Sequence, residues 1–377
     1  MKVKDICDLQ NGRAFKPGDW GNEGLPIIRI QNLNDEKAPF NYFSGEHSSV
    51  HEINDGDLLF SWSGTPGTSF GAFRWCRGKG VLNQHIFKIL PKIDVDKEYL
   101  KYALNGNINA IIAKAHGGVG LQHITKKELD EIDIPIIALP DQLKAVDRIS
   151  SAEKMIAIRK LELQKLDELV KARFVEMFGS ISNNVHGYEV KTLQEVCSQI
   201  KDGTHQTPIY TEDREKGVKF LSSKDVTSGK IDWSNIKYIP AELHEELYAR
   251  IKPQRGDILL AKNGTTGVAA VVDTDEVFDI YVSLALLRPI EINPVYLWAA
   301  VNSIDTKHQF DRSLKGIGVP NLHLGEIKKA KIIIPPMETQ VEFENFCNQI
   351  DKSKAIILSS LSKTQLLFES LMQEYFG

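Results

Sequence analysis

One short segment occurs twice in this chain, and this repeat constrains the possible folds more than any other feature. GDLLFSWSGTPG spans residues 56–67 and GDILLAKNGTTG spans residues 256–267, so both share the frame Gly-Asp-x-Leu-x-x-x-x-Gly-Thr-x-Gly. The middle residues differ, with Ser61-Trp62-Ser63 in the first copy and Ala261-Lys262-Asn263 in the second. Because Gly-Thr-x-Gly is a common turn on its own, this match needs support from elsewhere in the chain.

Four further matches follow the same order along the chain, at offsets between 197 and 200 residues. They pair Tyr99-Leu100 with Tyr296-Leu297, Ile134-Pro135 with Ile334-Pro335, Gln142 with Gln340, and Glu176-Met177-Phe178-Gly179 with Glu374-Tyr375-Phe376-Gly377. Such self-similarity at a nearly fixed period is typical of repeated structural units. The sequence therefore predicts that the whole chain is a duplication.

Each copy begins with strand-like segments separated by turn residues. The expected strands are PIIRIQNL (26–33), GDLLFSW (56–62) and HIFKIL (85–90), and then VKFLSS (218–223), GDILLAK (256–262) and VSLALLRP (282–289). One short helix is expected at each Tyr-Leu repeat. A chain of 377 residues is long enough to bury a core in each copy.

Each copy ends in a stretch without proline or glycine, 142–178 and 340–376, which predicts a helix of about 55 Å. The two stretches share one heptad register, which favours a coiled coil. The seam positions are Ala145, Ile149, Ala152, Ile156, Arg159, Leu163, Leu166, Val170, Arg173 and Met177, and then Phe343, Cys347, Ile350, Lys354, Ile357, Leu361, Thr364, Phe368, Leu371 and Tyr375. We expect Arg159 and Arg173 to pair with acidic groups across the coil. An antiparallel pair would relate the halves by a pseudo-twofold axis, and an ordinary helical hairpin is the alternative.

Composition argues against several classes of protein. No apolar stretch approaches membrane-spanning length, and the start MKVKDICDLQ does not read as a signal peptide. The four cysteines form no CxxC pair, so we expect a soluble cytoplasmic protein with reduced thiols. The net charge of −4 means that any DNA contact must depend on local basic patches or on a partner subunit.

The sequence shows no catalytic constellation. The glycine loops lack the Lys-Ser/Thr of a P-loop and the GxGxxG spacing, and the ten histidines show no metal-ligand spacing. Asn293-Pro294-Val295-Tyr296 resembles the Asn-Pro-Pro-Tyr loop of amino-methyltransferases. The other copy reads Asp96-Lys97-Glu98-Tyr99, however, so a helix cap explains both segments better. We therefore expect no enzymatic activity, no cofactor and no metal in this chain.

Two smaller matches have structural explanations as well as functional ones. Cys7 and Cys197 occupy similar places and are expected to be small buried residues. His123 and His323 match at an offset of 200 residues. Each is either a structural histidine or a contact to a phosphate.

The chain resembles the DNA-specificity subunit of type I restriction–modification systems. The residues that carry the resemblance are the two Gly-Asp frames from Gly56 and Gly256, and the junctions Ile134-Pro135…Leu139-Pro140-x-x-Gln142 and Ile334-Pro335-Pro336-Met337-x-x-Gln340. Each junction opens a long helix that ends in Phe-Gly. The resemblance covers the full chain, and the order and duplication of the motifs carry it.

The resemblance implies an α+β protein with two target-recognition domains, 1–140 and 180–337, joined by spacer helices 141–179 and 338–377 that form an antiparallel coiled coil. Each domain of such a subunit reads half of an asymmetric, bipartite site on double-stranded DNA. The subunit has no catalytic site and no cofactor. It docks two adenine methyltransferase subunits and, through them, restriction subunits, and these partners use S-adenosylmethionine and ATP.

Side chains suited to bases or phosphates supply the candidate DNA contacts. In the first domain they are Arg13, Lys16, Arg29, Asn32, Trp62, Ser63, Arg74, Arg77, Lys79, Gln84 and His85, with RWCRGK at 74–79 as the best patch. In the second they are Lys201, His205, Gln206, Lys224, Lys262, Asn263, Thr265, Arg312 and Lys315, with 312–321 expected as a mobile, glycine-bearing loop.

Three other functions remain possible from the sequence. The chain could be the specificity subunit of a related system outside type I, with a fused methyltransferase-nuclease as its partner. It could be a duplicated adaptor that binds only protein, which the net acidity favours slightly. An enzyme is the third possibility, and tight binding of S-adenosylmethionine would support it.

Overall fold

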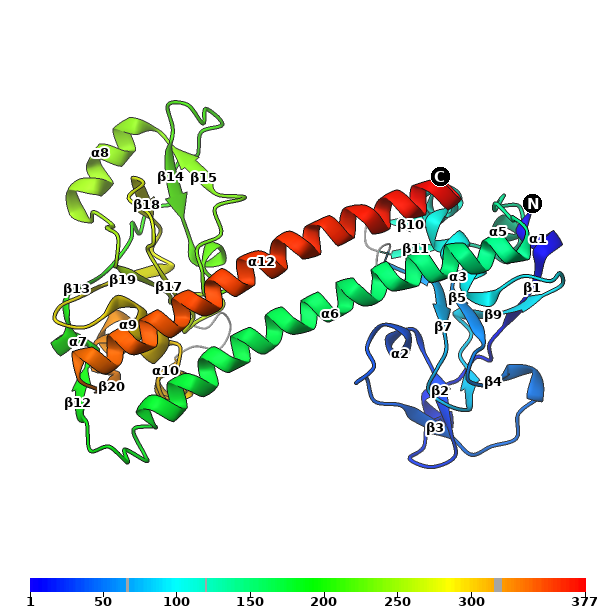
Figure 1. Ribbon diagram of the computed structural model, residues 1–377, viewed down its shortest axis with the longest axis horizontal. Helices are drawn as coiled ribbons and strands as arrows, with labels where there is room; N and C mark the ends of the chain where they lie inside the picture. The colour runs from blue at the N-terminus through cyan, green and yellow to red at the C-terminus, as the bar shows by residue number, and fades with distance from the viewer. Residues whose placement is uncertain (66–67, 119–120, 315–320) are drawn as a thin grey trace. The chain divides into compact units, whose positions relative to one another are not determined.

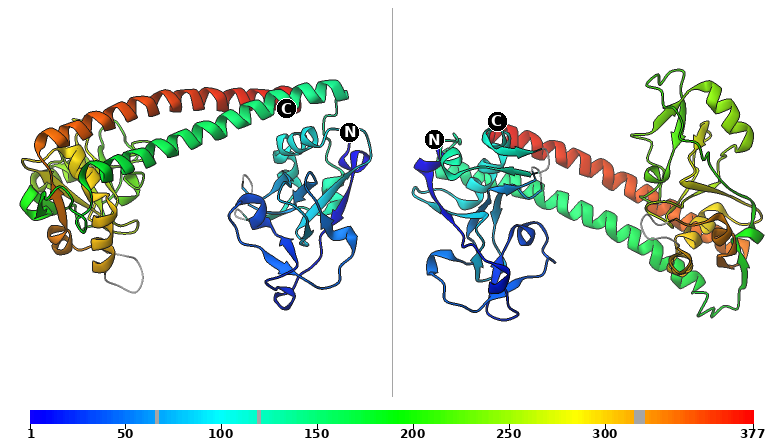
Figure 2. Two further views of the ribbon diagram at one scale, coloured as in Figure 1. Left: turned by 60° about the horizontal axis from the view of Figure 1, so that its bottom comes forward. Right: turned by 180° about the vertical axis from the view of Figure 1, so that it is seen from behind.

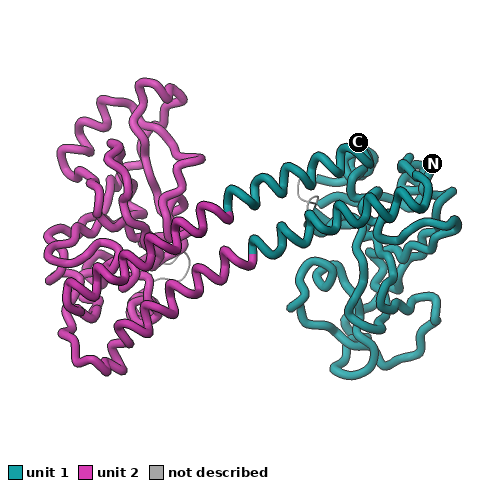
Figure 3. The backbone as a smooth tube through the Cα atoms, in the orientation of Figure 1, with its two compact units in different colours: residues 1–160, 358–377 teal, residues 161–357 magenta. Residues whose placement is uncertain are grey.

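The computed structural model describes residues 1–65, 68–118, 121–314 and 321–377 (Figure 1). The chain divides into two compact units (Figure 3). Unit 1 contains residues 1–160 and 358–377, and unit 2 contains residues 161–357. Both ends of the chain therefore belong to unit 1.

The main sheet of unit 1 is antiparallel, in the order β1-β9-β5-β7, with β1 at Cys7–Asn11, β9 at Ile86–Pro91, β5 at Leu58–Ser61 and β7 at Gly71–Arg74. All four residues of β5 are buried, as expected for a central strand. Next to this sheet, α3 (Lys97–Gly106) begins at Asp96, whose carboxylate accepts hydrogen bonds from the amides of Glu98 and Tyr99. The Asp-x-x-Tyr segment is therefore a helix cap, as its sequence predicts.

The remaining elements of unit 1 are short. A second sheet has the order β3-β2-β8-β4, with β2 and β8 parallel, and a third has the order β10-β11-β6. The strands are β2 (Leu25–Ile28), β3 (Asn41–Phe43), β4 (Glu52–Ile53), β6 (Ser63–Gly64), β8 (Gly80–Leu82), β10 (His116–Gly118) and β11 (Leu121–His123), and the helices are α1 (Val3–Ile6), α2 (Ile30–Asn34), α4 (Ile108–Lys114) and α5 (Lys126–Asp130).

Unit 2 repeats this plan. Its main sheet has the order β13-β19-β16-β17 (Cys197–Asp202, Leu284–Pro289, Ile258–Ala261, Ala269–Val271), which matches the main sheet of unit 1 strand for strand. A second sheet has the order β15-β14-β18, again with one parallel pair, and β12 pairs with β20. The other elements are β12 (Glu189–Thr192), β14 (Val218–Leu221), β15 (Lys237–Ile239), β18 (Phe278–Ile280), β20 (Lys331–Ile334), α7 (Leu193–Val196), α8 (Ala241–Arg250), α9 (Pro294–Val301), α10 (Ile304–Ser313) and α11 (Leu324–Lys329).

Two long helices of 40 residues each, α6 (Leu139–Phe178) and α12 (Met337–Phe376), contribute one segment to each unit. Within each unit the two segments run antiparallel (Figures 1 and 2). Every predicted seam position is buried or half-buried. Arg173 bonds Glu342 of α12 at 3.0 Å, which confirms one of the two predicted ion pairs, and Arg159 lies half-buried on the seam.

The structure corrects two details of the predicted elements. The segment PIIRIQNL is a strand only at its start, because α2 begins at Ile30. Asn32 favours this turn, since its side-chain oxygen accepts a hydrogen bond from the amide of Arg29. The sequence predicted a single short helix at each Tyr-Leu repeat, but a second one, α4 or α10, follows it in each unit. Among the described residues, no helix combines the length and the hydropathy needed to cross a membrane.

Candidate nucleic-acid interface

The repeated Gly-Asp frame is built in the same way in both units. Gly56 and Gly256 have φ of +82° and +91°, a region where a side chain would be strained. Asp57 accepts a hydrogen bond from the amide of Asn54 at 2.9 Å and pairs with Lys88 of β9 at 2.7 Å. Asp257 likewise accepts from the amide of Gln254 at 2.9 Å and pairs with Arg288 of β19 at 2.7 Å. The shared residues therefore hold the sheet together and form its scaffold.

Further residues shared by the repeats have the same structural role. The Asn105 side chain exchanges two hydrogen bonds with the backbone of Ala72, and Asn302 does the same with Ala269. The two repeats thus share one framework, and the side chains that differ between them can be compared at equivalent positions.

Residue 62 in unit 1 and residue 262 in unit 2 have equivalent backbone surroundings. The amide of Trp62 donates to the carbonyl oxygen of His85 at 3.3 Å, and the Trp62 carbonyl accepts from Ile124 at 3.0 Å. The amide of Lys262 donates to Ser283 at 2.9 Å, and its carbonyl accepts from Leu322 at 2.8 Å. In each unit this residue joins the end of a central strand to two other segments.

The two side chains at this position have different partners. The indole N–H of Trp62 lies within hydrogen-bond distance of Asn11 Oδ1 (3.2 Å) and of the Gln84 carbonyl oxygen (3.1 Å), and its ring packs on His85 at 5.1 Å. The ammonium of Lys262 bonds Asp202 Oδ2 at 2.8 Å, and both side chains are only 8% exposed. The sequence singles out Trp62 and Lys262, but it does not predict the partners that hold each side chain within its own unit.

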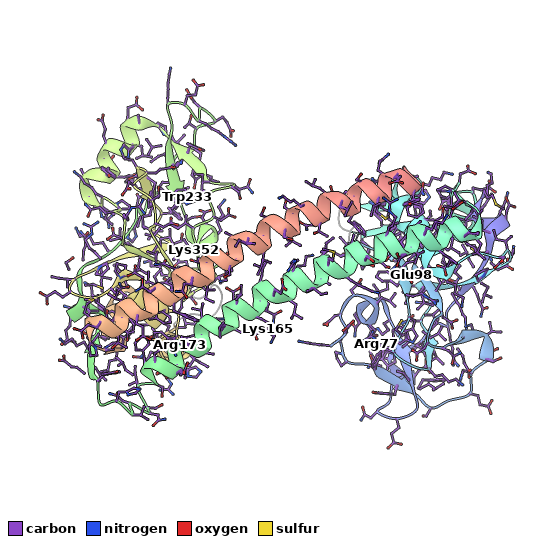
Figure 4. All side chains as sticks on the ribbon, in the orientation of Figure 1. Arg77, Glu98, Lys165, Arg173, Trp233 and Lys352 are labelled. Atoms are coloured by element: carbon purple, nitrogen blue, oxygen red, sulfur yellow. The ribbon has the colours of Figure 1, made fainter. Side chains whose placement is uncertain are left out.

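Three arginines of unit 1 lie against aromatic rings. Arg13 lies over Phe43 at 4.6 Å, Arg29 over Trp20 at 5.1 Å, and Arg77 over Trp75 at 4.8 Å (Figure 4 labels Arg77). Stacking on a ring orients a guanidinium while leaving N–H groups at its edge for other partners. These arginines are therefore partly ordered before any ligand arrives.

The other candidates of unit 1 differ in how accessible they are. Lys16, Lys79, Gln84 and His85 are exposed, whereas Arg74 is half-buried against Glu98 and Ser63 is buried. Asn32 is 2% exposed, and its carboxamide bonds the backbone of Arg29, Ala38 and Pro39. In this conformation Asn32 would have to give up internal hydrogen bonds to bind a base.

Most candidates of unit 2 are exposed: Lys201, His205, Gln206, Lys224, Thr265 and Arg312. His205 lies 3.3 Å from Asp202, which brings it close to Lys262. Asn263 pairs with Asn321 through a backbone bridge, and the side-chain oxygen of each is buried without a hydrogen bond among the described residues. Lys315, and most of the loop expected at 312–321, lie outside the described residues.

Two titratable groups near the exchanged positions have shifted pKa values. Burial and the charge of nearby His123 lower the pKa of His85, which favours a neutral imidazole. Burial alone would raise the pKa of Asp202, but its hydrogen bond to Lys262 and the charges of Lys262 and His205 outweigh burial and lower it. Asp202 is therefore a carboxylate at neutral pH.

Three residues of this region were not predicted from the sequence: Asn11, Asp202 and Arg250. Arg250 reaches Asp202 from α8 at 3.4 Å and is 49% exposed. A signal for the first two was present, because Asn11-Gly12 and Asp202-Gly203 follow the matched Cys7 and Cys197 by nearly the same distance. Across the described residues, no cluster of three or more His, Cys, Asp or Glu side chains is arranged to hold a metal ion.

Comparison with known proteins agrees with this architecture. Residues 1–168 and 186–366 match the family model described as the type I restriction modification DNA specificity domain. The type I restriction enzyme EcoBI specificity subunit of Escherichia coli is 22% identical over 100% of this chain and 85% of its own length. The MjaVIII specificity subunit of Methanocaldococcus jannaschii is 24% identical over 79% of this chain and 73% of its own length.

Two solved structures share the fold along the whole chain. One is the S subunit of a type I restriction–modification system from M. genitalium, with a TM-score of 0.59, 15% identity, and coverage of 100% of this chain and 95% of that one. The other comes from a study of complex assembly in a type I R-M system, with a TM-score of 0.57, 14% identity, and coverage of 100% and 96%. The expected architecture, two repeated α+β domains with two long helices, is confirmed.

Proposed function

Because the chain belongs to the family of type I restriction modification DNA specificity domains, we propose that it is the DNA-recognising subunit of such a system and that each unit reads one half of an asymmetric, bipartite site. One observation carries the proposal most directly. The two units share a scaffold and one backbone arrangement at residues 62 and 262, yet they place different side chains there. Two unlike readers on one framework require two unlike half-sites.

The accessible cations and polar groups of each unit form its DNA-contacting set. In unit 1 these are Arg13, Lys16, Arg29, Arg77, Lys79, Gln84 and His85, and in unit 2 they are Lys201, His205, Gln206, Lys224, Thr265 and Arg312. Such side chains bond phosphates and base edges, and their local concentration compensates for the net charge of −4. Arg74, Asn263 and Lys315 remain candidates for direct contact, whereas Asn32, Trp62, Ser63 and Lys262 support the set from within.

The long helices supply a surface for protein partners. Large apolar side chains are exposed along both: Leu143, Met155, Ile158, Leu358, Leu366 and Leu367 in unit 1, and Leu161, Leu169, Val175, Met337, Val341 and Ile356 in unit 2. A soluble protein gains from covering such residues. Two adenine methyltransferase subunits dock on these helices, and restriction subunits join through them. The chemistry belongs to the partners, and this chain contributes recognition alone.

Genome-wide methylation mapping tests the proposal. The chain is expressed with its own methyltransferase partner in a host without other adenine methylation, and methylated adenines are mapped. The expected result is a single motif with two short, different half-sites around a fixed gap. If no methylation depends on the chain and its DNA binding does not weaken steeply with salt, the adaptor function replaces this one.

A matched pair of arginine variants tests the assignment of one half-site to unit 1. Arg77→Gln removes a guanidinium of the proposed contact set and should relax or weaken recognition of one half-site only. Arg255→Gln is the control, because Arg255 lies outside that set and pairs with Asp275 at 2.8 Å. Equal effects of the two variants on both half-sites would contradict the assignment.

A further inference from the structure

Residues Asn11 and Asp202 hold corresponding places in the two units. Each ends the first strand of its main sheet and precedes a glycine, Gly12 or Gly203. A Cβ on Gly12 would lie 2.1 Å from the carbonyl oxygen of Asn83, and one on Gly203 would lie 2.0 Å from that of Ile280. Both glycines therefore let the chain pass directly against the segment that precedes β9 in unit 1 or β19 in unit 2.

The exchange between the units involves both members of a pair. Unit 1 combines a neutral amide with a neutral indole, Asn11 with Trp62, whereas unit 2 combines a carboxylate with an ammonium, Asp202 with Lys262. A mixed pair of Lys262 with a neutral partner would leave a buried charge uncompensated, which is strongly unfavourable. The two positions are therefore coupled, and a change at one requires a change at the other.

Each pair also contacts exposed groups, and Gln84, His85 and His205 among them belong to the proposed DNA-contacting set. Trp62 holds the turn at Gln84 through the carbonyl oxygen and packs on the ring of His85. Asp202 attracts His205 at 3.3 Å and Arg250 at 3.4 Å, whose side chains are 65% and 49% exposed. Each pair thus helps to place neighbouring groups that face solvent.

We propose that the Asn11–Trp62 and Asp202–Lys262 pairs are two versions of one brace, partly exposed in unit 1 and buried in unit 2, that positions the DNA-reading side chains of each unit, and that Lys262 acts through this brace without touching DNA. The inference rests on the proposed function and deepens it. It makes Asp202 and Lys262 positioning residues for one half-site. It also explains why Lys262, a residue type suited to phosphates or guanine, is buried and neutralised by a carboxylate.

A double-mutant cycle tests the brace in the complex of the full chain with its methyltransferase partner. Asp202→Asn and Lys262→Met are measured singly and together on duplexes that carry the mapped motif, and on duplexes with one half-site scrambled. Each single variant should weaken binding at the half-site of unit 2 by about tenfold or more. The double variant should bind several-fold more tightly than either single variant, because no buried charge is left alone. It should stay below the wild type, because His205 and Arg250 lose the carboxylate that attracts them.

The other half-site and a control lysine separate this result from general damage. Recognition of the unit 1 half-site should not change, and Lys352→Met, at an exposed lysine of α12 (Figure 4), should behave as wild type. If Lys262 contacted DNA itself, the double variant would be as weak as Lys262→Met, and the inference would be overturned. If one single variant fails to fold, comparison of the double variant with the other single variant still tests the brace.

Different results would overturn the proposed function and the brace. A methylation map without any motif that depends on this chain would remove the proposed function. A normal map combined with a double variant that does not recover would remove only the brace.

Discussion

Cys76 offers a chemical probe of the basic segment RWCRGK. Its thiol is exposed, whereas burial raises the pKa of the Cys7, Cys197 and Cys347 thiols to about 12. A thiol-specific reagent at about pH 8 should therefore modify Cys76 quickly and the other three only on unfolding. Cys76→Ser should remove the fast phase. Specific DNA should slow this phase several-fold, because Arg77 and Lys79 flank the thiol in the proposed contact set.

A control duplex and a contradicting result complete the Cys76 labelling experiment. A duplex without the mapped motif, at a salt concentration that suppresses nonspecific binding, should give no protection. Unchanged labelling in the specific complex would show that residues 74–79 lie away from DNA.

Glu131 predicts a pH-dependent contribution to the stability of unit 1. Hydrogen bonds from Lys2 and then Lys4 lower the pKa of Glu131 from 4.5 to about 2. Because the folded value lies below the unfolded one, the contribution is complete above about pH 4.5 and is lost as the pH falls toward 2. The melting temperature of Glu131→Gln should therefore differ from that of the wild type most at about pH 6, and the two should converge in acid. A difference that does not vary with pH would contradict the ion pairs.

At the scale of elements, a buried glutamine fastens each long helix to its domain. Gln142 is 1% exposed; its side-chain oxygen accepts from the amide of Asp96 at 2.9 Å, and its nitrogen donates to Ile137 at 2.8 Å. Gln340 makes the same two bonds to Asn293 and Pro335. This repeated clamp connects the start of a long helix with the cap of a short one.

Replacing the clamp should be costly. Gln142→Met keeps the size of the side chain but leaves a buried donor and a buried acceptor unpaired, so we expect the free energy of unfolding to fall by about 2 kcal/mol or more. Chemical denaturation measures this change. Gln164→Met on the same helix is the control, since Gln164 is exposed and its side chain bonds Glu168 one turn along the same helix. Equal losses in the two variants would exclude the clamp.

The elements that could be predicted from sequence are those with strong periodicity. The seam from Ala145 to Met177 predicts α6, and the buried apolar run of Leu58 to Phe60 predicts β5. The second half of PIIRIQNL forms α2 because the Asn32 side chain bonds the amide of Arg29, and hydrophobic periodicity gives no signal for such a bond. The divergent positions of the interface were also predictable from the repeat. That Lys262 is buried was not, because its partner Asp202 lies 60 residues away in sequence.

At the scale of the whole molecule, we propose that the long helices act as a spacer, and this role predicts a change in the gap of the DNA motif when their length changes. Duplicating one heptad in each helix, residues 154–160 and residues 351–357, preserves the seam and adds about 10.5 Å to both. At about 3.4 Å per base pair, the unread gap should grow by about three base pairs while both half-sites stay the same. Methylation mapping of the variant measures the gap.

Variants with only one long helix extended provide a control for the spacer role. Duplicating a heptad in only one helix puts the two seams out of register over part of their length and should abolish methylation. A changed half-site in the doubly extended variant, or an unchanged gap, would exclude the spacer role.

Unit 1 is built from the two ends of the chain, and this sets the order in which the protein can mature on the ribosome. Leu371 and Phe376 are 3% and 4% exposed and belong to the same core as β1 and β5, which are made first. About 200 residues separate residue 160 from residue 358, so synthesis at about 5–20 residues per second leaves that core incomplete for about 10–40 s. Unit 2 is a continuous stretch, so all of its residues are synthesised before the last side chains of the unit 1 core.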